Sequence, residues 1–309
     1  MLSKRAFQCP PGLMARAAGR PPLPMAVVAA NSAVALQSAA AATTAGLIEP
    51  VLVGDGNAIR RIADAERIDL FGWRIVEAAD DAEAAATSAA LARSGEVAAL
   101  MKGHLHTDIL MRAALDKDTG LRAGRRMTHV FHMTVPDCDR ALLITDAAVN
   151  VTPDLKTRLD IVHNAVDLAR AIGVDRPKVA LLSATEDPIP SMPTSMEARE
   201  TQRALEAQGI EGFSVLGPLA LDIAVSPEAA RAKGVDHPVA GHADIIAVPN
   251  IETGNGLFKM MVYFMGATAA GIVLGAKVPI VLTSRADPPE ARLAAAALAA
   301  LMAPAPATA

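Results

Sequence analysis

Short apolar runs alternate with longer amphipathic stretches along most of this 309-residue chain. Apolar runs of about four to eight residues bounded by turn residues are typical of strands buried in a parallel sheet. The intervening amphipathic stretches are typical of helices, so the alternation predicts an α/β fold with mostly parallel sheets and helices on both faces. The runs that predict strands span residues 25–30, 51–53, 97–101, 130–134, 141–145, 178–183, 245–248, 272–274 and 280–283.

The most regular helical pattern starts at Pro153, a residue that suits the first helical position because its missing N–H costs nothing there. Gly173 ends this pattern. A second helix is expected after Asn31 and Ser32, which can cap the alanine-rich stretch that follows them. The apolar stripe of the first helix consists of Leu155, Leu159, Val162, Val166 and Ala169.

Two segments resemble sorting signals but predict ordinary elements. The first 48 residues lack Asp and Glu, as targeting peptides do, yet the apolar run at 25–30 is short and predicts the first strand. Residues 260–276 carry no charge, but glycines interrupt them, and Lys259 and Lys277 bracket them too closely for a bilayer. They predict a buried helix followed by a buried strand. We therefore expect a cytoplasmic protein without a membrane span.

Composition narrows the class of protein further. Hydrophobic residues make up 52% of the chain and aromatic residues 3%, so the core must rest on Ala, Val, Leu, Ile and Met. The net charge of −4 offers no basic surface and argues against nucleic acid as the main partner. Cys9 and Cys138 are too few for a disulfide framework, which fits a reducing compartment.

Polar residues with chemical potential follow several predicted strands. Because ligands bind beyond the carboxyl ends of strands in open α/β sheets, we expect these groups along one edge of the sheets. The alternative for each residue alone is a polar group where a buried strand meets water. Arg285 can grip a phosphate with its planar fork of donors, and the Ser284 hydroxyl can share an oxygen. The polar groups at these strand ends are Lys102, Asp146, Glu186, Asn250, Ser284 and Arg285.

A second anion site is expected at the sequence Gly254-Asn255-Gly256. Asn255 is suited to be the N-cap of a helix, and Lys259 then falls near the first turn, where the helix dipole disfavours a cation. A bound phosphate or coenzyme A would reverse that preference. The alternative is a solvated lysine on an ordinary helix.

The histidines do not predict a metal site. His104 and His106 flank one residue, and His129 and His132 are three apart in a predicted strand, where they face opposite sides. Neither pair comes with the further ligands that zinc requires.

Several of these segments together, in this order, resemble the phosphate acetyl/butyryltransferases (phosphotransacylases), most closely the butyryltransferase-like branch. The resemblance runs from about Val27 to Ala300. The segments that carry it are Met101-Lys102-Gly103, residues 145–150, Pro153-Asp154-Leu155, residues 217–222, residues 238–241, Ala243-Asp244, Gly254-Asn255 and residues 282–285.

The resemblance implies a fold similar to isocitrate/isopropylmalate dehydrogenases, with two α/β domains around a cleft. One domain would hold residues 1–138 and 272–309, and the other residues 139–271. The family is typically dimeric through the second domain, so a homodimer is expected.

The resemblance also implies an activity. A short-chain acyl-CoA and phosphate would be interconverted with an acyl phosphate and coenzyme A, by direct transfer in a ternary complex, without a bound cofactor or metal. Ser284 and Arg285 would stabilise the reacting phosphoryl group, with help from the backbone N–H of Asn255. Arg125 or Arg126 could add phosphate contacts. Substrate contacts are expected from Lys102, His106, Thr107, Arg112, Asp146, Asn150, Asn255 and Lys259.

Asp287 has two interpretations. A carboxylate must deprotonate the thiol of coenzyme A, but Asp287-Pro288-Pro289-Glu290 also fits a helix capping box, in which the aspartate would be a weaker base. We expect the cap. In the acetyl branch the corresponding aspartate lies several residues farther on, so Glu290 and Asp146 are also candidates for the base.

Three alternatives remain open from the sequence. A decarboxylating dehydrogenase of the same fold would need clustered aspartates around a metal. An acyl-carrier-protein phosphate acyltransferase would favour long chains. A non-catalytic relative that binds acyl-CoA or acyl phosphate is consistent with Asn250 in place of a common aspartate and Ile189-Pro190-Ser191 in place of Asn-Pro-Lys. The acyl-chain preference is also open, and Met192, Met196 and Met260 are candidate pocket walls.

Overall fold

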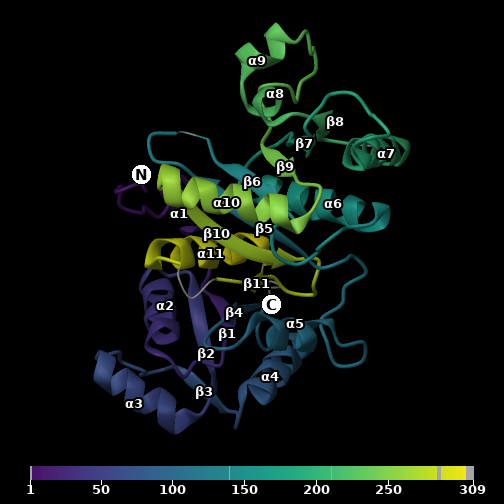
Figure 1. Cartoon of the computed structure of the whole chain (residues 1–309). Coiled ribbons are helices and arrows are strands. Elements are labelled where there is room, and N and C mark those ends of the chain that lie inside the picture. The colour runs from purple at the N-terminus through teal and green to yellow at the C-terminus, as the bar shows by residue number, and fades with distance from the viewer. Residues whose placement is uncertain (1, 139, 210, 284–286, 304–309) are drawn as a thin grey trace. The chain divides into compact units, whose positions relative to one another are not determined.

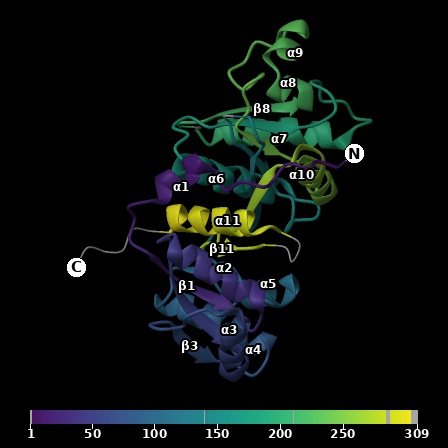
Figure 2. The same ribbon diagram turned by 90° about the vertical axis from the view of Figure 1, so that its left-hand side faces the viewer.

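The computed structural model describes residues 2–138, 140–209, 211–283 and 287–303 (Figures 1 and 2). The chain divides into two compact units. Unit 1 comprises Met1–Phe7 and Thr128–Ala269, and unit 2 comprises Gln8–Met127 and Ala270–Ala309. Each unit combines strands with covering helices, so the predicted α/β class is confirmed.

The strands of unit 2 are arranged in the order β3-β2-β1-β4-β11-β10. Neighbours pair in parallel, apart from the antiparallel pair β10–β11. Figure 1 shows α2 and α3 on one side of these strands and α4 and α5 on the other. Figure 2 shows α1, α11 and α2 beside one another. The elements of unit 2 are β1 Leu23–Val28, β2 Ile48–Gly54, β3 Arg74–Glu77, β4 Ala99–Lys102, β10 Thr268–Leu274, β11 Ile280–Val281, α1 Pro11–Ala17, α2 Ala33–Thr44, α3 Gly56–Glu66, α4 Asp81–Ser94, α5 Thr107–Leu115 and α11 Pro289–Met302.

The strands of unit 1 are arranged in the order β5-β6-β9-β7-β8, with β5–β6 antiparallel and the other pairs parallel. Two helices cover opposite faces of β5. The Asn164 side chain of α6 donates to Thr128 Oγ1 at 2.9 Å, whereas Phe258 of α10 stacks on Phe131, whose side chain faces the other way. The elements of unit 1 are β5 Thr128–Thr134, β6 Leu142–Thr145, β7 Lys178–Leu182, β8 Ser214–Leu219, β9 Ile245–Ala247, α6 Leu155–Ala171, α7 Pro193–Ala207, α8 Leu221–Val225, α9 Pro227–Ala232 and α10 Ile251–Met265.

Each predicted strand corresponds to a strand of the structure, but β3 and β8 were not predicted. β3 is a four-residue edge strand with a charged residue at each end and no buried position, so it lacks an apolar run. β8 contains Gly217-Pro218, a pair that normally indicates a turn.

Helix starts differ from the sequence predictions at two places in unit 1. The helix expected from Pro153 begins at Leu155, because the Asp154 side chain caps it by accepting from Thr157 N at 2.8 Å. The predicted start of α10 at Asn255 is also wrong. That helix begins at Ile251, after Asn250, whose side chain accepts from Thr253 N at 3.0 Å. Ser32 does cap α2 as predicted.

The burial predicted for α10 is likewise wrong. Of its described residues only Gly254 is buried, and Met260 and Phe264 are 60% and 57% exposed. The strand that follows, β10, is buried along its whole length, as expected. Among the described residues, no helix has the length and apolar character needed to cross a bilayer.

Candidate active site

A candidate site of unit 2 lies where β1 and β4 end. β1 leads into α2 on one side of the strands and β4 leads into α5 on the other, so the crevice between these ends is a topological switch point, where α/β proteins bind ligands. A cavity of about 270 Å³ occupies this crevice. Its lining residues are Ser32, Ala33, Val34, Ala35, Ser38, Met101, Lys102, Gly103, His104, Val281, Thr283 and Arg292.

Gly103 brings the end of β4 against the end of β1. Its N–H donates to Val28 O at 2.9 Å, and the N–H of His104 donates to Ala29 O at the same distance. A Cβ at position 103 would lie 2.4 Å from Val28 O, so any side chain there would force the two strand ends apart. The close approach places Lys102 and His104 beside the first turn of α2.

Two cationic side chains, Lys102 and Arg292, are among the residues that line the cavity. Lys102 is 9% exposed, and Arg292 reaches the cavity from the first turns of α11. Burial lowers the pKa of Arg292, and the nearby Asp287 carboxylate partly opposes this effect. The first N–H groups of α2 have no acceptor within their own helix and add partial positive charge. The cavity therefore suits an anionic ligand.

The predicted pair Ser284 and Arg285 lies outside the described residues. Thr283, which directly precedes the pair, lines the cavity. Asp287 does not form the predicted capping box in the expected register, because α11 begins at Pro289 and its N-cap position is Pro288. Asp287 instead lies one residue before the cap, where its charge acts on Arg292.

The residues expected at the start of α5 are not part of the cavity lining. His106 occupies the N-cap position without a side-chain cap bond, and Thr107 is the first helical residue. Arg112 is 80% exposed and pairs with Asp108 at 3.4 Å. All three lie on the surface of unit 2.

In unit 1, Asp146 organises the loop after β6. This carboxylate is 2% exposed and accepts hydrogen bonds from the backbone N–H groups of His129, Ala148, Val149 and Asn150 at 3.0–3.3 Å. Asn150 Nδ2 adds a fifth bond at 2.6 Å. With its lone pairs engaged in this way, Asp146 is better suited to hold the loop than to accept a substrate proton.

The other strand-end groups of unit 1 also have partners in the structure. Asn250 caps α10, and Glu186 pairs with Lys233 Nζ at 3.5 Å. Asn255 and Lys259 lie within α10, with Lys259 in the third turn. Asn255 therefore does not form a helix N-terminus, and the anion site predicted at such an N-terminus is not present there.

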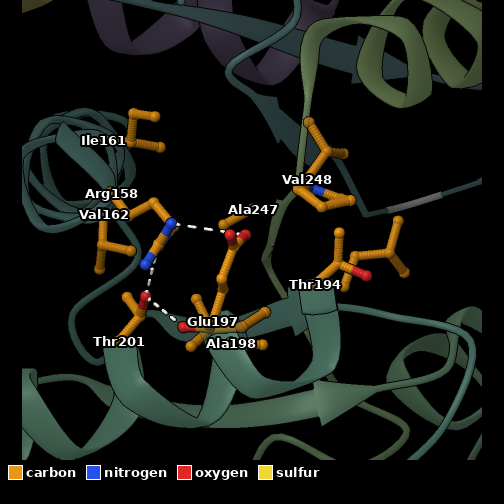
Figure 3. Close-up of a pocket in the computed structure, with 12 residues that line it drawn as sticks. Arg158, Ile161, Val162, Thr194, Glu197, Ala198, Thr201, Ala247 and Val248 are labelled. Carbon is orange, nitrogen blue, oxygen red and sulfur yellow. Dashed lines mark hydrogen bonds and ion pairs between the residues drawn. The ribbon is translucent and has the colours of Figure 1, made fainter. Parts of the chain in front are cut away.

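Another cavity, in unit 1, is too small to bind a substrate, and carboxylates already neutralise the arginine that lines it. It has room for about one water, at about 20 Å³. Figure 3 shows Arg158 of α6 pointing toward Glu197 and Thr201 of α7, with its Nε 2.9 Å from Thr201 Oγ1. Glu197 and Glu200 lie 3.5 and 2.9 Å from the guanidinium. Arg158 thus joins two helices and has no capacity left for a substrate anion.

The part of the chain that the structure describes contains no group of three or more His, Cys, Asp or Glu residues that could hold a metal ion. His129 and His132 are both buried in β5. Burial lowers the pKa of His132 to about 4, so this ring is neutral at physiological pH.

The sequence identified Lys102, and the motifs of the family resemblance include its cavity neighbours Met101, Gly103 and Thr283. The other lining residues were not predicted as parts of a site for substrate. The strand-to-helix turn at Ser32 was a usable signal, because such turns place helix N-termini at ligand sites. His104 was considered for a metal only. Val34 and Arg292 gave no local signal, since their place in the cavity depends on how distant segments assemble.

An α/β fold with cationic side chains in a cavity at its strand ends is an arrangement typical of proteins that bind small anionic ligands. Residues 81–300 match the family model described as phosphate acetyl/butaryl transferase. A phosphate acetyltransferase of Rhizobium meliloti is 47% identical, over 93% of this chain and 92% of the relative. A phosphate butyryltransferase of Clostridium acetobutylicum is 41% identical, over 90% of this chain and 93% of the relative.

A solved structure agrees with these relatives. The branched-chain phosphotransacylase of Enterococcus faecalis V583 matches with a TM-score of 0.79 at 30% identity, over 91% of this chain and 99% of the other. The chain belongs to the phosphate acetyl/butyryltransferase family, whose members are acyltransferases.

Proposed function

We propose that the chain interconverts a short-chain acyl-CoA and phosphate with an acyl phosphate and free coenzyme A. The observation that carries this proposal is the cavity of unit 2, where Lys102 and Arg292 lie beside the strand end that precedes Ser284 and Arg285. Coenzyme A acts as a substrate, and the reaction balances without a further cofactor.

The chemistry is a direct transfer in a ternary complex. A phosphate oxygen attacks the thioester carbonyl carbon, and the carbon–sulfur bond breaks as the thiolate of coenzyme A leaves. We assign Arg285 to the phosphoryl group and to the negative charge of the tetrahedral centre, with a hydrogen bond from Ser284 beside it. Burial, and to a smaller extent the Glu290 carboxylate, raises the pKa of Cys9 to about 11, so that thiol is a poor nucleophile for an acyl-enzyme.

In the reverse direction the thiol of coenzyme A must lose its proton. We assign this step to Asp287, which lies just before α11, outside the cap position, in unit 2 with the cavity. Glu290 is a second candidate. Asp146 is less suited, because five N–H groups already donate to it.

Among the substrate contacts, Lys102 has the best support from the cavity. Asn255 and Lys259 retain only the family resemblance as support, because both lie inside α10. The other contacts that we propose from the resemblance are His106, Thr107, Arg112, Asp146 and Asn150.

We further propose the finer architecture that the resemblance implies: two domains in an isocitrate/isopropylmalate dehydrogenase-like arrangement, with residues 1–138 and 272–309 in one and residues 139–271 in the other. The division into two compact units supports two domains, although these units place Met1–Phe7 and residues 128–138 with the second domain and residues 270–271 with the first. We also propose a cytoplasmic homodimer, which the exposed apolar residues of α10 support.

The test is phosphate-dependent release of free thiol from acetyl-, propionyl- and butyryl-CoA. We expect release with at least one of these substrates, and we expect Arg285→Lys to lower turnover by at least about tenfold, because an ammonium cannot form the two-donor fork. Equal circular dichroism spectra would show that the variant is folded. Failure of phosphate to stimulate release with every acyl-CoA would exclude the proposed activity.

A further inference from the structure

We propose that the cavity of unit 2 holds the acyl chain of the substrate, and that Val34 limits the length of that chain. This inference rests on the proposed function, because it concerns which part of an acyl phosphate or acyl-CoA enters the cavity.

Both apolar and polar side chains line the cavity. Val34 and Met101 supply branched or flexible apolar surface, alanines 33 and 35 supply small apolar surface, and the fully buried Val281 adjoins this apolar part. Lys102, Thr283 and Arg292 supply polar and cationic groups to the same space. A ligand that fills such a cavity must itself have an anionic or polar head and a short apolar tail, and a short acyl group joined to phosphate has both.

The size of the cavity favours the acyl chain over the bulk of coenzyme A. Pockets for drug-sized ligands span about 300–1,000 Å³. At about 270 Å³, this cavity falls below that range and has no room for a nucleotide together with its pantetheine arm. The competing occupant is the end of the pantetheine arm alone, which the test below distinguishes.

The exposed fractions of the lining side chains indicate which of them lie deep in the cavity and which lie near its opening. Met101 and Val281 are 3% and 0% exposed, so they form a floor that packing holds in place. Val34 is 45% exposed and lies in the first turn of α2, at the open side. A larger side chain at position 34 can therefore shorten the available space without disturbing the core.

The experiment compares Val34→Phe and Val34→Ala with a control, Val225→Phe. Val225 is also a helical valine, 44% exposed, but it belongs to α8 of unit 1 and does not line the cavity. The measured quantity is kcat/KM for acetyl-, propionyl-, butyryl- and hexanoyl-CoA, with thermal unfolding as a check on the fold.

We expect Val34→Phe to lower the ratio of butyryl to acetyl kcat/KM by at least about tenfold, since one or two methylenes in an apolar pocket change specificity by about that factor or more. Val34→Ala should raise the ratio of hexanoyl to butyryl. Val225→Phe should leave both ratios unchanged.

An equal loss for every chain length in Val34→Phe, with a raised KM for coenzyme A in the reverse reaction, would overturn the proposal and assign the cavity to the pantetheine arm. Unchanged kinetics in both Val34 variants would overturn it as well. Lack of phosphate-dependent activity in the unmodified protein would instead reject the proposed function, so the two failures are distinguishable.

Discussion

At the scale of single residues, burial determines what several ionisable groups can do. Burial raises the pKa of the Cys9 thiol and lowers the pKa of the Arg292 guanidinium, in each case because the charged form loses hydration. Asp146 shows a different effect of burial, because its side chain accepts five hydrogen bonds from the loop around it and so has a structural role. A polar residue that follows a strand is therefore not necessarily catalytic, because it can instead have a structural role.

His132 gives a prediction about pH and stability. Burial lowers its pKa from 6.5 to about 4 in the folded protein. The unfolded chain therefore binds a proton at a higher pH than the folded chain, and stability falls as the pH drops from 6.5 toward 4. Between pH 7 and pH 5 this residue should cost about 2 kcal/mol of unfolding free energy. Urea unfolding of the unmodified protein and of His132→Phe at both pH values measures the difference.

The expected result is a smaller loss of stability on acidification in His132→Phe, because the variant has no proton to bind at this position. Equal losses in both proteins would show that His132 does not titrate in this range during unfolding.

At the scale of secondary-structure elements, the start of α10 shows how packing overrides a local pattern. Gly254-Asn255-Gly256 predicts a turn, yet all three residues are helical. A Cβ at position 254 would lie 2.7 Å from the Cβ of Ala147, so Gly254 allows the helix to seat against the loop after β6. Gly256 has no heavy atom within 4 Å of an added Cβ.

These two glycines form a matched pair for mutation. Gly256→Ala should stabilise the protein by about 0.5–1 kcal/mol, because alanine favours the helix. Gly254→Ala gains the same propensity but forces a contact, and overpacking typically costs about 1–3 kcal/mol. We expect Gly254→Ala to be less stable than Gly256→Ala by about 1–3 kcal/mol in urea unfolding. A difference near zero would show that the Ala147 loop can move at little cost.

The same contrast explains how far the sequence predicts this fold. Strands buried on both faces, such as β1 and β9, can be predicted from the sequence. Both faces need apolar side chains, so successive residues are apolar and form a continuous run. The edge strand β3 is not visible because it has no buried apolar run, and β8 is not visible because its Gly217-Pro218 pair normally indicates a turn. The same distinction applies to the residues of the candidate site. Lys102 follows from its place after a strand, whereas Val34 reaches the same cavity only through the parallel pairing of β1 with β4.

At the scale of the whole molecule, the distribution of exposed apolar side chains bears on assembly. Met260, Tyr263 and Phe264 are spaced three and four residues apart on α10 and are 60%, 50% and 57% exposed. Residues with this spacing lie on one face of a helix. Contiguous exposed apolar surface on a folded protein usually marks an interface, and a homodimer through this face would cover it.

The prediction is that Phe264→Glu shifts the protein from dimer to monomer. A charge in the middle of a two-fold interface faces its own copy, so both desolvation and like-charge repulsion oppose association. Phe71→Glu is the matched control. Phe71 is also an exposed phenylalanine, at 91%, but it belongs to unit 2, whereas α10 belongs to unit 1. Sedimentation velocity over a range of protein concentrations measures the outcome.

We expect a dimer for the unmodified protein and for Phe71→Glu, and a monomer for Phe264→Glu at the same concentrations. A dimer that survives Phe264→Glu, or that Phe71→Glu dissociates, would place the interface elsewhere, and a monomeric unmodified protein would reject the homodimer itself.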